Sequence, residues 1–474
     1  MNRKILISPY GRALGVFTLF ALMMINSSAA LADEVTIGMS KEVAYILNSF
    51  MFLMCGVLVM WMAAGFAMLE AGFVRIHNTS VICLKNVALF AIAGMMYYLI
   101  GYNLMYVDVG DHGLFGTFNI FYEPNATELA LMATDDENTA EIKAKTLQIL
   151  AEEDYSTMSD WFFQMVFVAT AASIVSGTVA ERIRLRPFLI FVAVLSAFIY
   201  PIQGSWSWGE GWLNGIGFSD FAGSTIVHSV GGWAALTGAI ILGPRVGKYG
   251  PNGEITPIKG SNMPLATIGT LILWMGWFGF NGGSVLAMNS TKAVTTMSVV
   301  FVNTNMAASA GCIAAMFYAI IVKGKPDLTY VLNGALAGLV SITAGPDVAS
   351  PGTAMLIGAI GGVLCSMAIP MFDRLKIDDV VGALSVHLVC GIWGTLAVAI
   401  FMTGDFVAQI TGIVAVAIFV SSTSAALWLF LKYSIGIRVH DEHERTGLDH
   451  PEVGTEAYAG FYYRSNTEEQ DEDV

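Results

Sequence analysis

Charged residues are scarce in this sequence. Only 13% of its 474 residues are charged, whereas soluble domains carry roughly 25%. Hydrophobic residues make up 55%, and apolar stretches of about 20 residues follow one another, each long enough to cross a hydrocarbon core of about 30 Å. This composition excludes a soluble globular chain and predicts an all-α polytopic membrane protein.

The sequence also lacks the signs of a nucleic-acid partner, a disulfide, a metal site or a familiar enzyme motif. The formal net charge is -14, but acidic residues gather in the 122–160 loop and the 464–474 tail, which indicates solvated ends and no nucleic-acid partner. The five cysteines form no CxxC pair, so we expect neither a disulfide nor a metal site. Neither HExxH nor GxSxG occurs, which disfavours an intramembrane enzyme. We expect no cofactor, and we interpret the tail histidines His440, His443 and His450 as solvated.

The first 32 residues have the pattern of a secretory signal. Arg3, Lys4 and Arg12 give a basic start, the apolar run Leu14–Ile25 follows, and Ala30-Leu31-Ala32 has the small residues of a cleavage site. We therefore predict a cleavable signal peptide over 1–32, a membrane domain over 33–434 and a cytoplasmic tail over 435–474. The alternative is an uncleaved first helix.

Eleven membrane spans are predicted after the signal. They cover about 43–69, 79–106, 159–180, 187–207, 221–243, 263–287, 295–322, 328–345, 352–372, 380–402 and 406–434. Lysine and arginine crowd the loops that this count places inside, as the positive-inside rule expects. The mature amino terminus would then lie outside and the carboxyl tail in the cytoplasm. The long segment of about 107–158 would be an acidic outer insertion, with a helix-favouring piece at Thr139–Glu153.

Two stretches repeat one motif. Asp220 precedes His228 by eight residues, Asp379 precedes His387 by the same interval, and a glycine follows each histidine after four more residues. Eight helical residues rise about 12 Å. Because the two motifs open spans five and ten from opposite faces, both histidines approach the midplane. This predicts inverted repeats of spans one to five and six to ten, with span eleven outside them and a site between the repeats.

The histidines have two interpretations. They are either packing residues that share one hydrogen bond, or pore residues that offer one donor and one acceptor to a small polar solute. Ionisable groups at membrane depth are expensive, so we favour the functional interpretation.

Aromatic residues form a second group of candidate site residues. Trp206, Trp208 and Trp212 lie at the outer end of span four, and Phe163 and Phe167 are one turn apart in span three. Interfacial tryptophans commonly anchor a protein in the membrane, and the phenylalanines suit an ordinary core. Beside Asp220, the same rings could hold a small cation by cation–π attraction.

These motifs resemble those of the ammonium transporter (Amt/Mep/Rh) family. Besides Asp220–Trp233, the matching segments are 276–284 (GWFGFNGGS), 69–75 (LEAGFVR), 179–184 (VAERIR), 383–392 (ALSVHLVCGI) and 444–449 (ERTGLD). The similarity runs from about residue 40 to about 460. It implies an eleven-span protomer with a pseudo-twofold repeat, a homotrimer, and one narrow pore in each protomer.

The resemblance also implies roles for particular residues. Phe163, Trp208 and Ser284 correspond to the outer ammonium-recruitment site, where Asp220 is the structural acid. Phe167 and Phe280 correspond to the stacked gate, and His228 and His387 to the twin pore histidines. The presence of Trp208 favours the Amt branch over the Rhesus branch. The long acidic insertion and the acidic residues 467–474 depart from the common pattern.

The expected function is therefore transport of ammonium or ammonia, with methylammonium as an analogue, across a bacterial inner membrane. Residues 435–462 would pack against neighbouring protomers and couple to a P-II-type signal protein. Two alternatives stay open: an ammonium sensor with little flux, and a passive channel for neutral gas or water.

Overall fold

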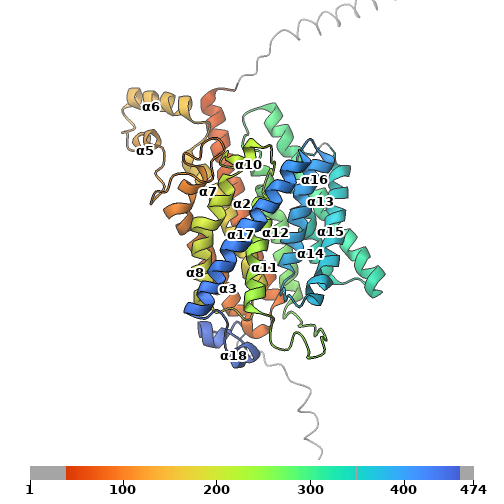
Figure 1. Cartoon of the computed structure of the whole chain (residues 1–474). Coiled ribbons are helices and arrows are strands. Elements are labelled where there is room, and N and C mark those ends of the chain that lie inside the picture. Colours follow the sequence, from red (N-terminus) through yellow and green to blue (C-terminus); the bar gives the residue numbers. More distant parts are fainter. Residues whose placement is uncertain (1–38, 349, 459–474) are drawn as a thin grey trace, which may run out of the picture.

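The computed structural model describes residues 39–348 and 350–458 and forms a bundle of membrane-length helices (Figure 1). Within these residues, ten helical stretches are long and apolar enough to cross a membrane. They are α2 (Lys41–Phe73), the stretch Ile76–Tyr106 that contains α3 (Thr79–Met96) and α4 (Tyr102–Tyr106), α7 (Thr157–Thr178), the stretch Leu185–Ser205 that joins α8 (Leu185–Val194) to α9 (Tyr200–Ser205), η4–α11 (Ser224–Leu242), α12 (Met263–Gly283), α13 (Thr291–Lys323), α15 (Pro351–Arg374), η5–α16 (Leu384–Phe401) and α17 (Phe406–Ser434). The predicted signal peptide lies outside the described residues.

The predicted span at 328–345 is shorter than expected. Helix α14 (Leu328–Ile342) has 15 residues and rises about 22 Å, which is less than the hydrocarbon thickness of about 30 Å. From Leu332 to Ile342 every residue of α14 is buried, so the helix lies inside the protein and α13 and α15 pack against it. Together with the ten longer stretches, it completes the eleven apolar helices that the sequence predicts.

Polar side chains fix where many of these helices begin. Ser40, Ser290 and Ser350 each accept a hydrogen bond from a backbone N–H in the first turn of α2, α13 and α15, respectively. Asn262 and Asp405 do the same for α12 and α17. Each cap satisfies an N–H group that has no partner inside the helix, which is worth about 1 kcal/mol.

The two halves of the bundle repeat one local structure. The fifth span opens with the π-helical turn η4 (Ser224–Ser229) and the tenth with the π-helical turn η5 (Leu384–Val389). A glycine with positive φ precedes each turn closely, Gly223 at 107° and Gly382 at 82°. The first helices of the two halves, α2 and α12, pack along each other. This correspondence agrees with the predicted inverted repeats.

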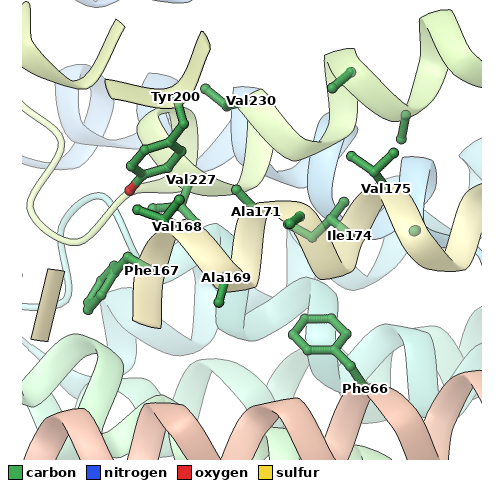
Figure 2. Close-up of a cluster of buried hydrophobic side chains, with 14 of the residues drawn as sticks. Phe66, Phe167, Val168, Ala169, Ala171, Ile174, Val175, Tyr200, Val227 and Val230 are labelled. Atoms are coloured by element: carbon green, nitrogen blue, oxygen red, sulfur yellow. The ribbon is translucent and has the colours of Figure 1, made fainter. Parts of the chain in front are cut away.

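Helix α7 lies at the centre of the bundle. All its residues from Phe163 to Thr178 are buried. In Figure 2, its residue Phe167 lies on the side of Phe66, while Val168 and Ala171 lie toward Val227 and Val230. Alanines and a glycine on α7 let the neighbouring helices approach closely, as small residues do in membrane helix packing.

The outer insertion and the tail lie at opposite ends of the bundle (Figure 1). The insertion contains α5 (Ala126–Met132) and α6 (Thr139–Glu152), so the predicted helical piece forms. Glu128 connects the insertion to α2 and α7. It accepts hydrogen bonds from the Tyr45 hydroxyl at 2.6 Å and from the Thr157 backbone N–H at 3.1 Å. The tail contains α18 (Asp441–Thr446) and η6 (Asp449–Val453).

Candidate functional site

His228 and His387 meet in the interior. Their Nδ1 atoms are 3.2 Å apart, and the two side chains belong to η4 and η5. His228 is fully buried and His387 is 4% exposed. A single proton between the two Nδ1 atoms leaves one ring with an unprotonated Nε2 and the other with a protonated Nε2. The pair therefore offers one acceptor and one donor, and Nε2 of His228 has no partner among the described residues.

A row of aromatic rings leads to this pair. The ring centroids of Phe167 and Phe280 are 4.1 Å apart, and Phe280 stacks on the ring of His228 with centroids 5.2 Å apart. Phe167 also contacts Trp208 edge to face at 5.9 Å. On the other side of the pair, Phe66 lies 6.2 Å from His387, centroid to centroid. The two predicted gate residues thus separate Trp208 from the histidines.

A cavity of about 420 Å³, which we call the outer cavity because it lies at the predicted outer face, adjoins the predicted gate residue Phe167. Three of the four predicted recruitment residues, Phe163, Trp208 and Ser284, line it together with Phe167. The hydroxyl of Ser284 donates to the Phe280 carbonyl oxygen at 2.9 Å, so its oxygen lone pairs stay free to accept. The cavity joins aromatic faces to a hydrogen-bond acceptor, which suits a small cation that carries N–H groups.

Asp220, the fourth predicted recruitment residue, lies behind this cavity and does not line it. Its carboxylate accepts four backbone hydrogen bonds, from Gly223 at 3.0 Å, Ser224 at 2.8 Å, Thr225 at 2.8 Å and Ile226 at 2.9 Å. Its carbonyl oxygen accepts from Trp208 Nε1 at 2.9 Å. The residue therefore holds both the first turn of η4 and the indole ring.

Asp160 also lines this cavity, and it is not among the site residues predicted from the sequence. Its side chain lines the cavity and is 7% exposed, with its oxygens accepting from the Tyr102 hydroxyl at 2.5 Å and from Gln164 Nε2 at 3.3 Å. No lysine or arginine lines the cavity, and within residues 39–348 and 350–458 Asp160 forms no ion pair. The sequence could have indicated a place for Asp160 in this cavity, because Asp160 precedes Phe163 by three residues and so shares its helix face.

A second cavity of about 270 Å³ lies at the opposite end. It is lined by charged and polar groups, among them Arg245, Lys248, Asp379 and Ser385. Asp379 repeats the role of Asp220 in part, since it accepts backbone hydrogen bonds from Ala383 at 3.1 Å and Leu384 at 2.8 Å.

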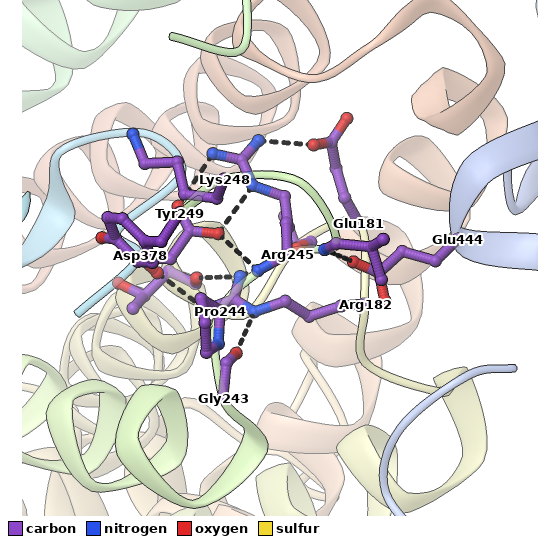
Figure 3. A network of polar contacts seen from close by, with 12 residues as sticks. Glu181, Arg182, Gly243, Pro244, Arg245, Lys248, Tyr249, Asp378 and Glu444 are labelled. Atoms are coloured by element: carbon purple, nitrogen blue, oxygen red, sulfur yellow. Dashed lines mark hydrogen bonds and ion pairs between the residues drawn. The ribbon is translucent and has the colours of Figure 1, made fainter. Parts of the chain in front are cut away.

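Beside this cavity, Arg245 bridges two acidic residues from different helical connections (Figure 3). Its guanidinium pairs with Asp378 at 2.8 Å and with Glu181 at 2.5 Å. Burial raises the pKa of both carboxyls, but the surrounding guanidinium groups together outweigh it. Arg245 with Arg75 holds the pKa of Glu181 below the usual range, and Arg245 with Arg182 does the same for Asp378. The ion pairs therefore stabilise the fold at neutral pH, and this contribution is lost as the pH falls below about 4.

The tail packs onto the same end. Glu444 accepts hydrogen bonds from the Val246 N–H at 2.6 Å and from Arg438 at 2.8 Å, and its carbonyl oxygen accepts from Arg75 at 2.9 Å. Asn78 accepts from the Leu448 N–H at 2.9 Å. The tail thus contacts the connections that follow the first and fifth spans.

Comparisons with known proteins found similarity over most of the chain. A model described as the Ammonium Transporter Family matches residues 50–458. The ammonium transporter Amt2 of Archaeoglobus fulgidus is 39% identical over 442 residues, which cover 86% of this chain and 87% of that protein. The ammonium transporter Amt1 of Haloferax mediterranei is 35% identical and covers 88% of this chain and 80% of its own length.

Solved structures with the same fold include a protein described as a sensor Amt protein. It is 35% identical with a TM-score of 0.77, and the match covers 87% of this chain and 100% of that one. Candida albicans Mep2 has a TM-score of 0.71 at 24% identity, covering 85% of this chain and 89% of its own, and shows the same fold.

Proposed function

The chain belongs to the ammonium transporter family, and we propose that it moves ammonium into the cell along the row from Trp208 through the gate to the two histidines. The observation that carries this route is the buried pair of His228 and His387, which lies in line with Phe280 and Phe167 below an aromatic cavity. The multi-pass helical fold agrees with the transporter names of the relatives.

Capture begins in the outer cavity. The faces of Trp208 and Phe163 attract the cation, each by about 0.5–2 kcal/mol. Ser284 offers lone pairs, and the carboxylate of Asp160 supplies a negative charge that no basic side chain of the cavity neutralises. These groups replace part of the hydration shell of NH4+.

The ion then loses a proton, because a charge deep in the membrane is costly. Neutral ammonia passes Phe167 and Phe280 and meets the histidine pair. The unprotonated Nε2 accepts a hydrogen bond from ammonia, and the protonated Nε2 donates one to its lone pair. When the unprotonated Nε2 takes up a proton, the shared proton shifts between the two Nδ1 atoms and the other Nε2 releases its proton. These three transfers together exchange the two roles, so the pair can pass a proton inward.

Assembly, targeting and regulation extend the proposal. We further propose a homotrimer in a bacterial cytoplasmic membrane, with a signal peptide over 1–32 removed, the new amino terminus outside and the tail inside, as the sequence motifs imply. Exposed apolar side chains along α2, including Ile46, Phe50 and Trp61, suit contact with lipid or a neighbouring protomer. The packed tail suits a P-II-type partner at the inner face.

Expression in cells that lack ammonium uptake tests the function. We expect restored growth at low ammonium, uptake of methylammonium, and an ammonium-evoked current from protein in liposomes. Normal membrane insertion without growth, uptake or current would refute transport.

A sensor with little flux is the second candidate, because one similar solved structure is described as a sensor Amt protein. It predicts ammonium binding without a current. A passive channel for neutral gas predicts ammonia flux without a current and gives Asp160 no cation to bind.

A further inference from the structure

A small cavity lies on the inner side of the histidine pair. Its volume is about 10 Å³, close to the space that one water needs. His387 and Phe66 line one part of it, and Glu70 and Asn333 line another. The remaining wall is mostly apolar, so these groups determine what the cavity can hold.

Polar atoms around this cavity lack partners. Oε1 of Glu70 and Nδ2 of Asn333 form no hydrogen bond to any described residue, although the two residues are only 1% and 2% exposed. Leaving such buried atoms unpaired is unfavourable. One water in the cavity could donate to the Glu70 oxygen and accept from the Asn333 amide, with the His387 ring as a further neighbour.

The other oxygen of Glu70 is held in place. Oε2 accepts from the Ser176 hydroxyl at 2.7 Å and lies 3.6 Å from Nζ of Lys85. Lys85 in turn donates to the Ser176 carbonyl oxygen at 2.8 Å. The ammonium group balances the carboxylate charge through one oxygen and leaves the other oxygen available for a proton.

The small cavity leads toward the inner cavity. Asn333 and Val381 line both, and Ser385, whose hydroxyl also lacks a partner among the described residues, lines the inner one. Glu70 therefore lies between the histidine pair and the charged inner end of the molecule. It belongs to the 69–75 segment, which the route through the gate does not use.

We propose that Glu70 accepts the proton that His387 releases and returns it to ammonia on the inner side. This proposal rests on the function proposed above. At the outer side, an N–H bond of NH4+ breaks and its proton passes to the histidine pair. From His387 it moves through the water of the small cavity to Oε1 of Glu70. There the O–H bond breaks and a new N–H bond regenerates NH4+, so no redox partner is needed and Glu70 is restored.

A packing role for the Glu70–Lys85 pair is the competing explanation. The decisive variant is Glu70→Gln with Lys85→Met, because replacing both partners removes the acid without leaving a buried unpaired lysine. Glu141→Gln with Lys145→Met is the matched control, since it makes the same two replacements in an ion pair on the surface helix α6. Glu70→Asp alone keeps a carboxylate beside Lys85.

Purified full-length protein in liposomes gives two readouts: the current after an ammonium pulse, and the lumen pH from an entrapped dye. We expect the Glu70/Lys85 variant to lose current by about tenfold or more, as for loss of an acid–base group. It should still conduct neutral ammonia, which raises the lumen pH faster than in protein-free liposomes. Glu70→Asp should keep most of the current, and the control should match wild type.

Two results would overturn the relay. If the monodisperse Glu70/Lys85 variant keeps the wild-type current, the pair serves packing only. If it loses both current and ammonia flux, the pair holds the pore open and passes no proton. A wild-type protein that shows neither current nor uptake would refute the transport function itself, which separates that failure from failure of the relay.

Discussion

Replacing Asp220 by asparagine distinguishes a backbone-holding acid from an acid that attracts the cation. In the structure, Oδ1 accepts from the N–H groups of Gly223 and Ser224, and Oδ2 from those of Thr225 and Ile226. An asparagine keeps one acceptor oxygen and turns an NH2 group toward the other two donors. Each donor left unsatisfied costs about 1–3 kcal/mol, so the variant should lose about 2–6 kcal/mol of stability.

Asp160→Asn is the matched comparison. This carboxylate is also buried at the outer end, but it accepts only from the side chains of Tyr102 and Gln164. The Tyr102 hydroxyl can accept from the new amide and turn its own O–H toward the cavity, which Tyr102 also lines. We therefore expect little loss of stability and a weaker apparent affinity for ammonium, because the cavity loses one of its two carboxylates and keeps only that of Glu210.

Thermal unfolding of both variants in detergent, and the ammonium dependence of current in liposomes, provide the assay. Asp220→Asn should unfold at a clearly lower temperature than wild type, and Asp160→Asn close to it. The reasoning would be refuted if Asp220→Asn matched wild type in stability and changed only the affinity. Such a result would make Asp220 a cation ligand at a distance and not the support of η4.

Further predictions concern the pore and the inner face. Combined His228→Ala and His387→Ala should change the ammonium-evoked current or its selectivity while normal assembly survives size-exclusion chromatography, and wild-type behaviour would support mere packing. Trp208→Leu should raise the ammonium concentration for half-maximal current by about tenfold, as loss of one cation–π contact implies. Burial raises the pKa of Asp379 to about 6, since backbone hydrogen bonds offset burial only in part. Its raised pKa makes the fold bind protons more readily than the unfolded chain, so this contribution to stability declines as the pH rises from about 4 to about 6; Asp379→Asn should flatten that part of a melting-temperature profile.

Periodicity and charge were sufficient for the architecture. The lengths of the apolar runs located ten membrane-length helices among the described residues. A chain that crosses lipid must satisfy its backbone hydrogen bonds internally, which a helix does. The apolar pattern also predicted a helix at the position of α14. It did not predict that this helix has only 15 residues, since its end depends on packing inside the bundle. The repeated interval between Asp220 and His228, and between Asp379 and His387, was enough to predict two side chains that approach from opposite directions.

Other parts of the site depend on tertiary contacts that spacing does not encode. The π-helical form of η4 and η5 is one such feature, because the wider turn depends on hydrogen bonds that its backbone makes in the folded chain, such as those to Asp220 and Asp379. Asp160 and Glu70 are two others. Each looks like an ordinary acid near the end of an apolar run, and only the folded chain shows that one faces the outer cavity and the other the space behind His387.

The two inverted repeats share a backbone structure, but different side chains line the cavities at the two ends of the molecule. This difference gives the proposed ammonium route a direction. At the outer end, Asp220 holds the opening turn with four backbone bonds, and the adjoining cavity is aromatic with no lysine or arginine in its wall. At the inner end, Asp379 holds the corresponding turn with fewer backbone bonds, and Arg245 and Lys248 line the cavity. Aromatic faces with an unpaired carboxylate attract a cation, whereas the basic groups of the inner wall are held in ion pairs, Arg245 with Glu181 and Asp378, and Lys248 with Asp373. The two ends of the inverted fold therefore differ in the way that the proposed capture of ammonium on one side and its release on the other require.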